Sequence, residues 1–480
     1  MKKIVLLHFI LFSVAVFSQA PDKFYSKYGG GGVDIGNGLK ETYDKQYVLI
    51  GSTTSFGFGS ADAYLLLVDS MGQLIWQKTF GGNLADVGKN IIINPIDSGF
   101  IFTGFTSSFG NGGYDVYVVR TDKNGNLIWQ ASFGGIDWDF GNDLVLSVDG
   151  NIIVCGNTYS MGYGKSDGYL LKININNGGL MWQKYFGGVE DDFFTAIKVT
   201  SDGKYAVGGN SNNFGDLNGD FWFFKVGIAG DSIISKKISL TNKLEYCYDL
   251  IEDDNFNLVF CGSLDTSYNN VKKNISYLIK TDLNGTFISE FKNPGGYTDD
   301  DKFSSITKSK NGNSYCMARK VENGFFTTEI QPFLINTNYL YLATATYGGN
   351  LVDEANKIIF TSDNGYALVG FTNSFGSLSE DVFFVKLDFS VQNAVNIVSV
   401  KQTEGNIIPG RITFFNNVFS FENGNNRSLK CKLYNTEGIL IEEGITNNNE
   451  YNLKSNIPAG IYLFRLENDF RTGFLKFIKE

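Results

Sequence analysis

Apolar residues along most of the chain come in short runs that are separated by turn sequences. Residues 80–133 show the pattern clearly. Within this stretch, apolar or β-branched runs occupy residues 90–93, 100–104, 116–119 and 127–133. The turns at 97–99 and 122–125 contain Asp and Gly, and short runs ending at such turns predict antiparallel strands joined by hairpins. No segment keeps a helical period, so the pattern predicts an all-β protein.

This four-strand unit recurs about every 53 residues, and its marker is an aromatic residue followed by two glycines. The intact markers are Tyr28-Gly29-Gly30, Phe80-Gly81-Gly82, Phe133-Gly134-Gly135, Phe186-Gly187-Gly188 and Tyr347-Gly348-Gly349. The gap between the last two spans three repeats, with eroded markers near Ser239 and Pro294. Each sheet must stack on its neighbours to bury both faces, so seven repeats predict a seven-bladed β-propeller of four-stranded antiparallel blades.

The two ends of the repeat region complement each other. The last repeat stops after the strand near 381–388, whereas Phe24–Tyr28 resembles a fourth strand without a repeat of its own. Pairing these segments would close the ring and cover two bare sheet edges. The sequence therefore predicts a propeller at 21–390, a linker at 391–400 and a small C-terminal β-sandwich at 401–480.

Three tryptophans mark the last strand of the repeat. Trp76, Trp129 and Trp182 lie 53 residues apart, each four residues after a glycine. The pattern resembles the tryptophan-docking repeats of bacterial propellers, in which the indole packs on a neighbouring blade. On physical grounds alone, a large ring at one register of the outer strand is expected to fill the wedge between blades.

The N-terminus and the composition limit the available chemistry. Lys2-Lys3, an apolar stretch and the small-x-small sequence Ser18-Gln19-Ala20 predict a signal peptide at 1–20. Its removal takes away His8, the single histidine, and leaves a net charge of −12. The mature chain then has no imidazole for zinc or Ser-His-Asp chemistry, and its acidity disfavours nucleic acid. We predict no transmembrane segment after the signal.

The cysteines are odd in number and contain no CxxC pair. They are Cys155, Cys247, Cys261, Cys316 and Cys431. Cys155 and Cys261 fall at the small interior position of one strand of the repeat, so we expect buried thiols that act as small hydrophobic groups. The alternative is a single disulfide.

The strongest polar signal is an acidic residue six positions after each marker. The seven residues are Asp34, Asp86, Asp139, Asp192, Glu245, Asp300 and Asp353. A second acidic position precedes the third strand, and the fifth and sixth repeats lack it. Strand direction alternates in a meander, so the links between repeats and the second-to-third loops emerge on one face. If first strands line the channel, the seven acids ring its mouth.

Three interpretations of these acids are open. An Asp in a glycine-rich turn commonly accepts hydrogen bonds from nearby backbone amides, and each acid is then a folding device of its own link. Some carboxylates could instead bind Ca²⁺ with backbone carbonyls, although no EF-hand-like run is present. Carboxylate pairs could also serve glycoside chemistry, but nothing singles out one pair. No other cofactor is expected.

Aromatic residues recur in the second-to-third loops. Phe56, Phe109, Phe214 and Phe375 each stand between a Ser or Asn and a Gly. Exposed rings there could stack on sugars or contact a protein partner. Their regular offset from the markers favours the alternative that they fill the gap between blades.

The chain after residue 400 has a different rhythm. It contains the hairpin Leu433–Gly438, the turn Pro458-Ala459-Gly460-Ile461-Tyr462 and the basic tail Lys476–Lys479. In this order they resemble the type A C-terminal sorting domain of the type IX secretion system of Bacteroidota. The resembling residues at the core of that signal are Gly438, Pro458, Gly460, Tyr462, Lys476 and Lys479. The family often begins with an Asn-Pro step, where this chain has Asn416-Asn417.

The resemblance implies a route through the periplasm, the type IX secretion machinery as partner, and release from or attachment to the outer-membrane surface. With rigid blades and variable loops, the chain is predicted to be a secreted or cell-surface binding propeller, not an enzyme, whose ligand is a glycan or a protein. The alternative is a polysaccharide-active hydrolase or lyase that uses carboxylates at the channel mouth. A structural surface component is the remaining alternative.

Overall fold

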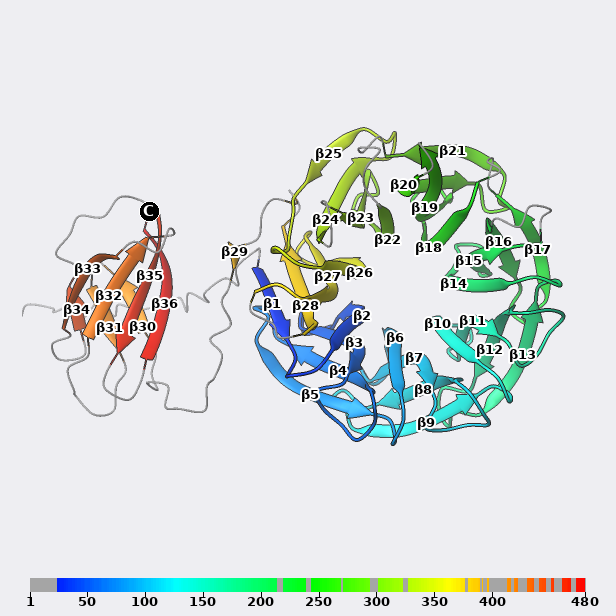
Figure 1. Ribbon diagram of the computed structural model, residues 1–480, viewed down its shortest axis with the longest axis horizontal. Coiled ribbons are helices and arrows are strands. Elements are labelled where there is room, and N and C mark those ends of the chain that lie inside the picture. The colour runs from blue at the N-terminus through cyan, green and yellow to red at the C-terminus, as the bar shows by residue number, and fades with distance from the viewer. Residues whose placement is uncertain are drawn as a thin grey trace, which may run out of the picture. The chain divides into compact units, whose positions relative to one another are not determined.

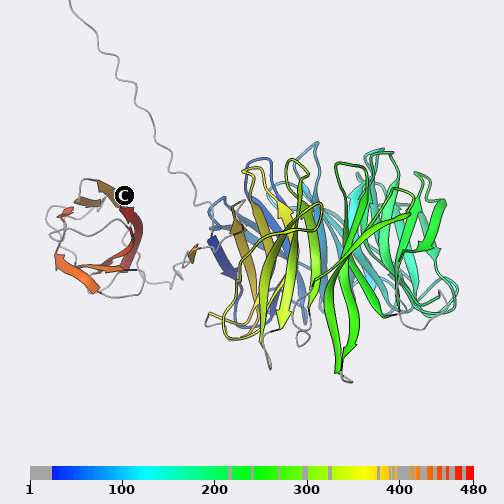
Figure 2. The same cartoon turned by 90° about the horizontal axis from the view of Figure 1, so that it is seen from above.

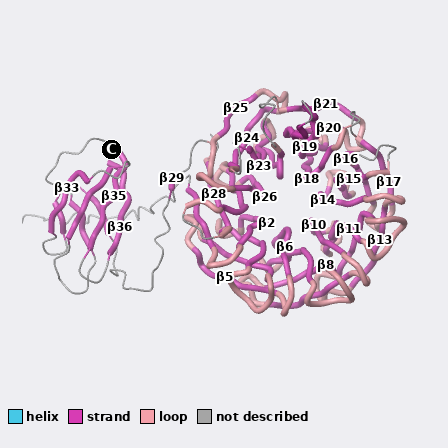
Figure 3. The backbone as a smooth tube through the Cα atoms, in the orientation of Figure 1, coloured by secondary structure: helices cyan, strands magenta, loops and turns pink. Residues whose placement is uncertain are grey.

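The computed structural model describes most of the repeat region and the strands of the C-terminal part. The described residues are 24–213, 219–238, 243–268, 271–293, 301–322, 327–375, 379–388, 391, 395–396, 412–415, 418–421, 430–435, 440–445, 450–452, 460–467 and 472–479. They fall in two compact units, Met1–Val398 and Ser399–Glu480. All regular elements of these residues are strands (Figure 3), as predicted. The same residues include no helix of the length and apolarity that a membrane span requires.

The first unit is a seven-bladed propeller, which confirms the predicted fold (Figure 1). Its first three blades are β2 (Asp34–Glu41), β3 (Tyr47–Thr53), β4 (Asp62–Val68) and β5 (Leu74–Phe80); β6 (Asp86–Ile93), β7 (Phe100–Thr106), β8 (Asp115–Thr121) and β9 (Leu127–Phe133); and β10 (Asp139–Leu146), β11 (Ile152–Thr158), β12 (Asp167–Ile173) and β13 (Leu180–Phe186). Each is an antiparallel sheet whose strands follow sequence order.

The next three blades repeat this arrangement. They are β14 (Asp192–Val199), β15 (Tyr205–Ser211), β16 (Asp220–Val226) and β17 (Ser232–Lys237); β18 (Glu245–Glu252), β19 (Leu258–Tyr268), β20 (Val271–Thr281) and β21 (Phe287–Lys292); and β22 (Lys302–Lys308), β23 (Ser314–Glu322), β24 (Thr328–Asn336) and β25 (Tyr341–Thr344). In Figure 1 the first strand of each blade lies innermost and the fourth outermost. The strands run between the two faces of the ring (Figure 2).

The last blade contains both ends of the propeller. It consists of β26 (Asp353–Phe360), β27 (Tyr366–Thr372), β28 (Asp381–Leu387), β1 (Phe24–Tyr28) and β29 (Val395–Asn396). β1 pairs antiparallel with β28 from Phe24 opposite Lys386 to Tyr28 opposite Val382, which confirms the predicted closure. β29 adds a short parallel strand at the outer edge of β1, which the sequence did not predict.

Closure reuses the contact that joins the other blades. Trp76 lies against Gly125 of the next blade, where an added Cβ would come within 2.8 Å of the indole, and Trp129 lies in the same way against Gly178. Both glycines have a positive φ, +73° and +70°, which favours glycine independently of the indole. Trp182 lies against Gly230, so the predicted docking of all three tryptophans on the next blade is confirmed.

The N-terminal strand β1 makes the equivalent contact with the first blade. Phe24 has the register of these tryptophans, and its ring lies against Gly72, where an added Cβ would be 2.3 Å away. Phe24 is fully buried and packs edge-on against Phe384 of β28. Tyr28 donates a hydrogen bond of 2.8 Å to the Gly72 carbonyl. β1 therefore joins the last blade by its backbone and the first blade by its side chains.

The first strands are tied to one another around the channel. In every blade the pairing of the first two strands shifts by one residue, as between Gly36 and Gly38 of β2. The extra residue of such a bulge leaves the ladder, and here it often bonds the next blade. The Asn37 side chain donates to the Gly88 carbonyl at 2.8 Å, and Asn356 of the last blade donates to the Gly36 carbonyl at 2.9 Å.

The five cysteines are free and buried, as the interpretation of buried thiols predicted.

The C-terminal unit contains two antiparallel sheets among its described strands. One sheet has β30 (Ile412–Phe415), β31 (Val418–Phe421) and β34 (Glu450–Asn452); the other has β33 (Leu440–Ile445), β32 (Lys430–Asn435), β35 (Gly460–Glu467) and β36 (Thr472–Lys479). That these sheets form a β-sandwich stays a prediction.

Phe24 packs against both the last blade and the first blade where the ring closes. Phe24→Ala is therefore expected to lower the free energy of unfolding by about 3–5 kcal/mol, as truncation of a fully buried Phe does. Urea unfolding followed by tryptophan fluorescence measures the loss. Lys27→Ala, on the same strand, is the control: its ion pair with Asp381 is partly exposed and contributes about 1 kcal/mol or less. Equal and small losses in both variants would contradict the role of β1.

Candidate functional site

The face that carries the links between blades and the second-to-third loops is called the link face. The acids that precede or begin the first strands lie there, and their carboxylates turn into the links. Asp86 is fully buried, and its Oδ2 accepts hydrogen bonds from the Gly82 amide at 2.8 Å and the Ser108 hydroxyl at 2.7 Å. Asp34, Asp139 and Asp353 accept the same two bonds, and Asp192 accepts from Gly188 and Asn213. These are the bonds that the folding-device interpretation expects.

The second acidic position faces the first across the link. An added Cβ on Gly187 would lie 2.1 Å from Asp167 Oδ1 and 2.6 Å from Asp192 Oδ2, so the two oxygens are at most 4.7 Å apart. At Gly81 the corresponding distances are 2.5 Å to Asp62 Oδ1 and 2.4 Å to Asp86 Oδ2. A side chain at the first glycine of these markers would therefore collide with two carboxylates. That accounts for the first glycine of the aromatic-Gly-Gly signature.

Burial of these pairs changes their ionisation. Burial raises the pKa of Asp192, and the charge of Asp167 adds to the increase. Burial likewise raises the pKa of Asp115, with a smaller contribution from Asp139. Two other links contain a compensating lysine, since Lys27 pairs with Asp381 at 3.0 Å and Lys237 with Asp220 at 2.6 Å. A raised pKa means that the ionised form is the less favourable one in the folded link.

The sixth blade departs from the predicted register. Asp300 lies outside the described residues, and the position of the first-strand acid is held by Asp301, whose amide donates to the Asn274 carbonyl as Asp86 donates to Ala61. The second acidic position was predicted to be lost in this blade, but Glu329 occupies it, opposite Val321. The fifth blade has Ile275 there, opposite Leu264. Glu245 begins β18 and is fully buried, as the other first-strand acids are.

The loop phenylalanines are partly covered. The Phe56 ring packs on Tyr64 with centroids 5.6 Å apart, and Phe109 packs on Tyr117 at 5.8 Å. Phe375 is 41% exposed and lies 5.3 Å from the ring of Tyr25. Phe214 lies outside the described residues. Their use as binding residues stays a prediction.

A separate aromatic cluster reaches solvent between the second and third blades. Trp138 is 52% exposed in the link before β10, and its ring lies 6.1 Å from Tyr114 and 6.3 Å from Tyr159. Phe105 and Phe140 extend the cluster towards the channel, with centroids 5.1 Å apart. The indole is seated by Gly113, where an added Cβ would lie 2.2 Å from Trp138 Cδ1. We call these five residues the Trp138 cluster.

Further apolar side chains stand exposed on the same face. They are Phe58, Leu84, Ile136, Tyr163 and Val189, in loops and links of the first four blades. Phe58 is 91% exposed and Tyr163 is 74% exposed. Isolated exposed apolar residues are common on protein surfaces, whereas groups of them are the kind of feature that interaction surfaces have. Trp138 was not singled out from the sequence, because links carry no periodic pattern.

Polar groups accompany the Trp138 cluster at the channel wall. Lys89 of β6 lies with its ammonium 5.7 Å from the Phe105 ring centre, and burial lowers its pKa. Across the channel, Lys302 lies 5.7 Å from the Tyr248 ring centre and pairs with Glu354 at 3.2 Å. Aromatic rings and ammonium groups thus lie together near the link face, on β6 and β7 and on β18 and β22.

The other half of the channel holds charges that the repeat pattern did not predict. Asp143, Asp249, Lys40, Lys198 and Lys357 come from five different repeats and are not periodic. They line a cavity of about 520 Å³ whose wall contains first-strand residues of every blade. The signal that could have found them is departure from the repeat: other blades have Ile92, Val145, Ile251 and Ile359 at the register of Lys40 and Lys198.

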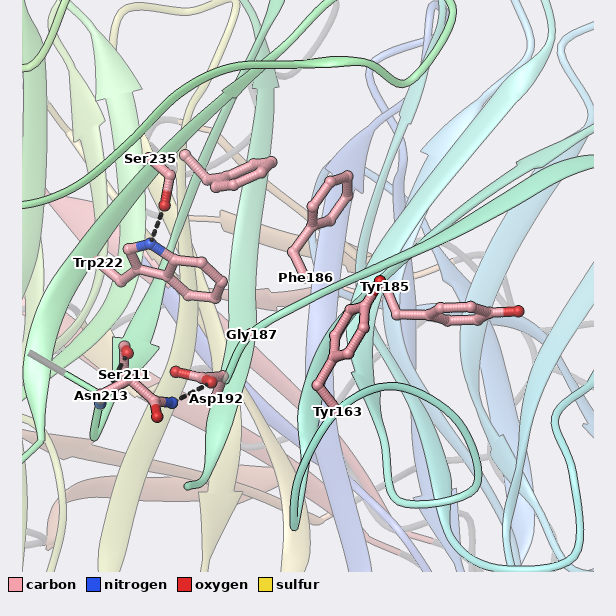
Figure 4. Close-up of a pocket in the computed structure, with 10 residues that line it drawn as sticks. Tyr163, Tyr185, Phe186, Gly187, Asp192, Ser211, Asn213, Trp222 and Ser235 are labelled. Carbon is pink, nitrogen blue, oxygen red and sulfur yellow. Dashed lines mark hydrogen bonds between the residues drawn. The ribbon is translucent and has the colours of Figure 1, made fainter. Parts of the chain in front are cut away.

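A second cavity, of about 440 Å³, lies between the third and fourth blades (Figure 4). Aromatic side chains form much of its wall, including Tyr185, Phe186 and Trp222. Figure 4 shows the Trp222 indole donating to Ser235, at 3.0 Å, and the Asn213 amide donating to Asp192. The Trp222 indole and the Asn213 amide are thereby already hydrogen-bonded within the protein.

Comparison with known proteins identifies the fold but no family. No protein-family model matches the chain, and no curated protein matches it. A polysaccharide lyase, an ulvan lyase solved with a GlcA(1-4)Rha3S saccharide, is 10% identical, with 77% of this chain and 96% of that chain covered and a TM-score of 0.52. The periplasmic gluconolactonase of Pseudomonas aeruginosa is 11% identical over 74% of this chain and 97% of that chain, with a TM-score of 0.46.

An extracellular domain of a one-component system from B. thetaiotaomicron is 12% identical over 94% of this chain and 58% of that chain, with a TM-score of 0.43.

At these identities the likeness concerns the fold alone. It nevertheless contradicts the prediction that the chain is not an enzyme. The lack of histidine and of a recognisable catalytic set excludes particular catalytic mechanisms. It does not exclude enzymatic activity, because a polysaccharide lyase has a similar fold, so the prediction that the chain is not an enzyme was wrong.

The link carboxylates can be tested through Asp192. Because burial raises its pKa above the ordinary 3.8, the ionised form costs stability, and wild-type protein should gain relative stability as the pH falls through the folded-state pKa. Asp192→Asn keeps an oxygen for the Gly188 amide, so its melting temperature at pH 7 should equal or exceed that of wild type, without the gain at low pH. Asp192→Ala should lose about 1–3 kcal/mol.

Thermal melting of the three proteins between pH 4 and pH 7 measures both effects. Melting with and without Ca²⁺ serves as the control for the cation interpretation. A calcium-dependent rise in the melting temperature of wild type that Asp192→Asn abolishes would contradict a purely structural link, because a ligand that binds only the folded state stabilises it.

Proposed function

We propose that this protein is a secreted or cell-surface propeller that binds a glycan on its link face, at the Trp138 cluster and the adjoining channel wall. The observation that carries the proposal is the exposed Trp138 indole, which is seated on Gly113 and continuous with Phe140 on the channel wall. Flat aromatic faces suit the apolar faces of sugar rings, and fixed rings lose little side-chain entropy when a ligand binds.

Charge supports an acidic glycan over a neutral one. Lys89 and Lys302 lie near the link face with their ammonium groups over Phe105 and Tyr248, and Lys302 already pairs with Glu354. An ammonium held against an aromatic ring keeps donor capacity for a carboxylate or sulfate. The net charge of the chain is −10, so attraction for an acidic ligand has to come from such local groups.

We further propose that the C-terminal unit is the export signal. The motif residues Gly438 and Pro458 lie outside the described residues, whereas Gly460 and Tyr462 belong to β35 and Lys476 to β36. Lys479 ends β36. The resemblance to sorting domains implies that this part of the chain is recognised by outer-membrane machinery. The predicted signal at residues 1–20 supplies the preceding step.

Cleavage of the bound glycan is the second candidate function. Lys89 favours it, because burial lowers the pKa of this lysine and a lysine with a lowered pKa can act as a general base. Five of the seven link carboxylates that were proposed from the sequence for this chemistry, Asp34, Asp86, Asp139, Asp192 and Asp353, are buried and already accept hydrogen bonds. Catalysis at this surface would therefore use Lys89 beside the Trp138 cluster in their place.

Trp138→Ala is expected to weaken retention on immobilised acidic polysaccharides at least tenfold, with the melting temperature changed little because the indole is half exposed. Affinity electrophoresis on a panel of acidic and neutral polysaccharides measures the change. Phe256→Ala is the matched control, since Phe256 is 61% exposed in a first-to-second-strand turn on the opposite face.

Equal retention of Trp138→Ala and Phe256→Ala on the polysaccharides would contradict the site. Loss of binding to a protein partner in Trp138→Ala, with retention on the polysaccharides unchanged, would favour a protein ligand. The same panel, assayed for new reducing ends and unsaturated products, tests cleavage. Product formation by wild type that Lys89→Met abolishes would establish the second candidate.

Removal of residues 399–480 is expected to leave the propeller in the periplasm of a bacterium with a type IX system, whereas the full chain reaches the cell surface or medium. The unit boundary places this cut between two separately compact parts, so folding of the propeller should persist. Cell fractionation and immunoblotting measure the distribution. Surface appearance of the shortened chain would contradict the assignment of the sorting signal.

A further inference from the structure

The cavity in the channel half away from the link face contains a network of charges with one lysine left over. Asp143 accepts hydrogen bonds from Asn90 and from the Ile197 amide, and pairs with Lys198 at 3.1 Å. Asp249 pairs with Lys357 at 2.7 Å and with Lys198 at 3.4 Å. Both aspartates are at least 97% buried, so their charges are held by these partners and not by water.

Lys40 lines the same cavity from β2 without such a partner. Among the residues that the structure describes, no carboxylate forms an ion pair with it. The carboxylate of the neighbouring Glu41 accepts two hydrogen bonds from Ser362, at 2.7 and 2.8 Å. The lysines of the cavity wall equal its carboxylates in number, but Glu41 is turned to Ser362, so Lys40 is the lysine without an ion pair among the residues that the structure describes.

Most of the surrounding wall is apolar. At the level of Lys40 the other first strands contribute Ile92, Val145, Ile251 and Ile359, together with Lys198 and Thr307. Leu146, Val199 and Ile93 continue the apolar surface. A cavity of about 520 Å³ has the size of ordinary small-molecule sites, which are mostly apolar with a few convergent polar groups. Lys40 has no ion pair among the described residues, and the carboxylate of a ligand can supply one.

We propose that this cavity binds a small organic carboxylate with an apolar body, and that the Lys40 ammonium pairs with the carboxylate while the isoleucine wall covers the body. A free inorganic anion would satisfy the ammonium and leave the wall uncovered. A neutral apolar molecule would cover the wall and leave the ammonium unpaired. A sugar acid would place hydroxyl groups against isoleucine side chains, which offer them no hydrogen bonds.

The electrostatic state of Lys40 agrees with a site that is completed by an anion. Its pKa is lowered to about 8, first by burial and then by the charges of Lys357 and Lys198, while Asp143 and Asp249 oppose the decrease. A bound carboxylate would raise this pKa again, so binding and protonation of Lys40 are linked. Affinity should therefore fall as the pH rises through about 8.

The test uses octanoate as the probe and octanamide as its uncharged counterpart, with the purified full chain. Isothermal titration should show that octanoate binds wild type at least tenfold more tightly than octanamide does. Lys40→Met keeps the length of the side chain and should weaken octanoate at least tenfold, without changing octanamide. Lys123→Met, in the exposed turn after β8, is the matched control and should bind octanoate as wild type does.

A folding measurement separates loss of the site from loss of structure. The folded-state pKa of Lys40 lies below its ordinary 10.5, so the unfolded chain binds more protons between pH 8 and pH 10.5 and stability rises with pH in that window. Without ligand, Lys40→Met should therefore melt at a higher temperature than wild type at pH 7, and this advantage should shrink towards pH 10.

Three results would overturn the proposal. Octanoate and octanamide could bind wild type equally, which would make the lysine irrelevant. Lys40→Met could bind octanoate as tightly as wild type does at pH 7. Neither probe could bind at millimolar concentration, which would mean that the cavity is not a site for such molecules. The glycan experiments on Trp138 are independent of all three outcomes, because they concern the opposite half of the channel.

Discussion

Stacking of each sheet against two neighbours is the constraint on which the rest of the molecule depends. No blade covers both faces of its own sheet, so the ring is stable only when it is complete. Completion rests on β1, which pairs with β28 through its backbone and covers Gly72 of the first blade with Phe24. The same ring-on-glycine contact joins Trp129 to Gly178. A closed ring in turn holds the first strands around one channel and the links on one face.

The polar residues of this propeller divide into two kinds according to their periodicity. Those that recur in the repeats, such as Asp86 with Gly82 and Ser108, accept hydrogen bonds within their own link. Those that break the repeat include Lys40, which has no ion pair among the described residues and so remains available to a ligand. A residue needed for stacking is required in each blade, whereas a binding site is required once, which accounts for the difference.

Much of the fold could be predicted because repetition supplies seven readings of one pattern. The blade count, the closing strand and the docking tryptophans followed from it. The sixth blade slipped by one residue, from Asp300 to Asp301, because its marker is eroded and no local pattern corrects the count. Trp138 was not recognised as part of a surface, because a link residue has no periodic counterpart. The prediction about enzymatic activity failed because missing residue types exclude mechanisms and not reaction classes.

The sequence by itself determined the strands, their number per blade and the ring, because spacing and turn chemistry are local properties that repeat along the chain. Only the tertiary structure decided which polar groups are already satisfied and which are not. The Asp143, Asp249 and Lys198 network joins side chains that lie about 50 or more residues apart, and its remaining lysine belongs to another blade again. Charge balance inside a channel is a sum over all blades, and no single repeat contains it.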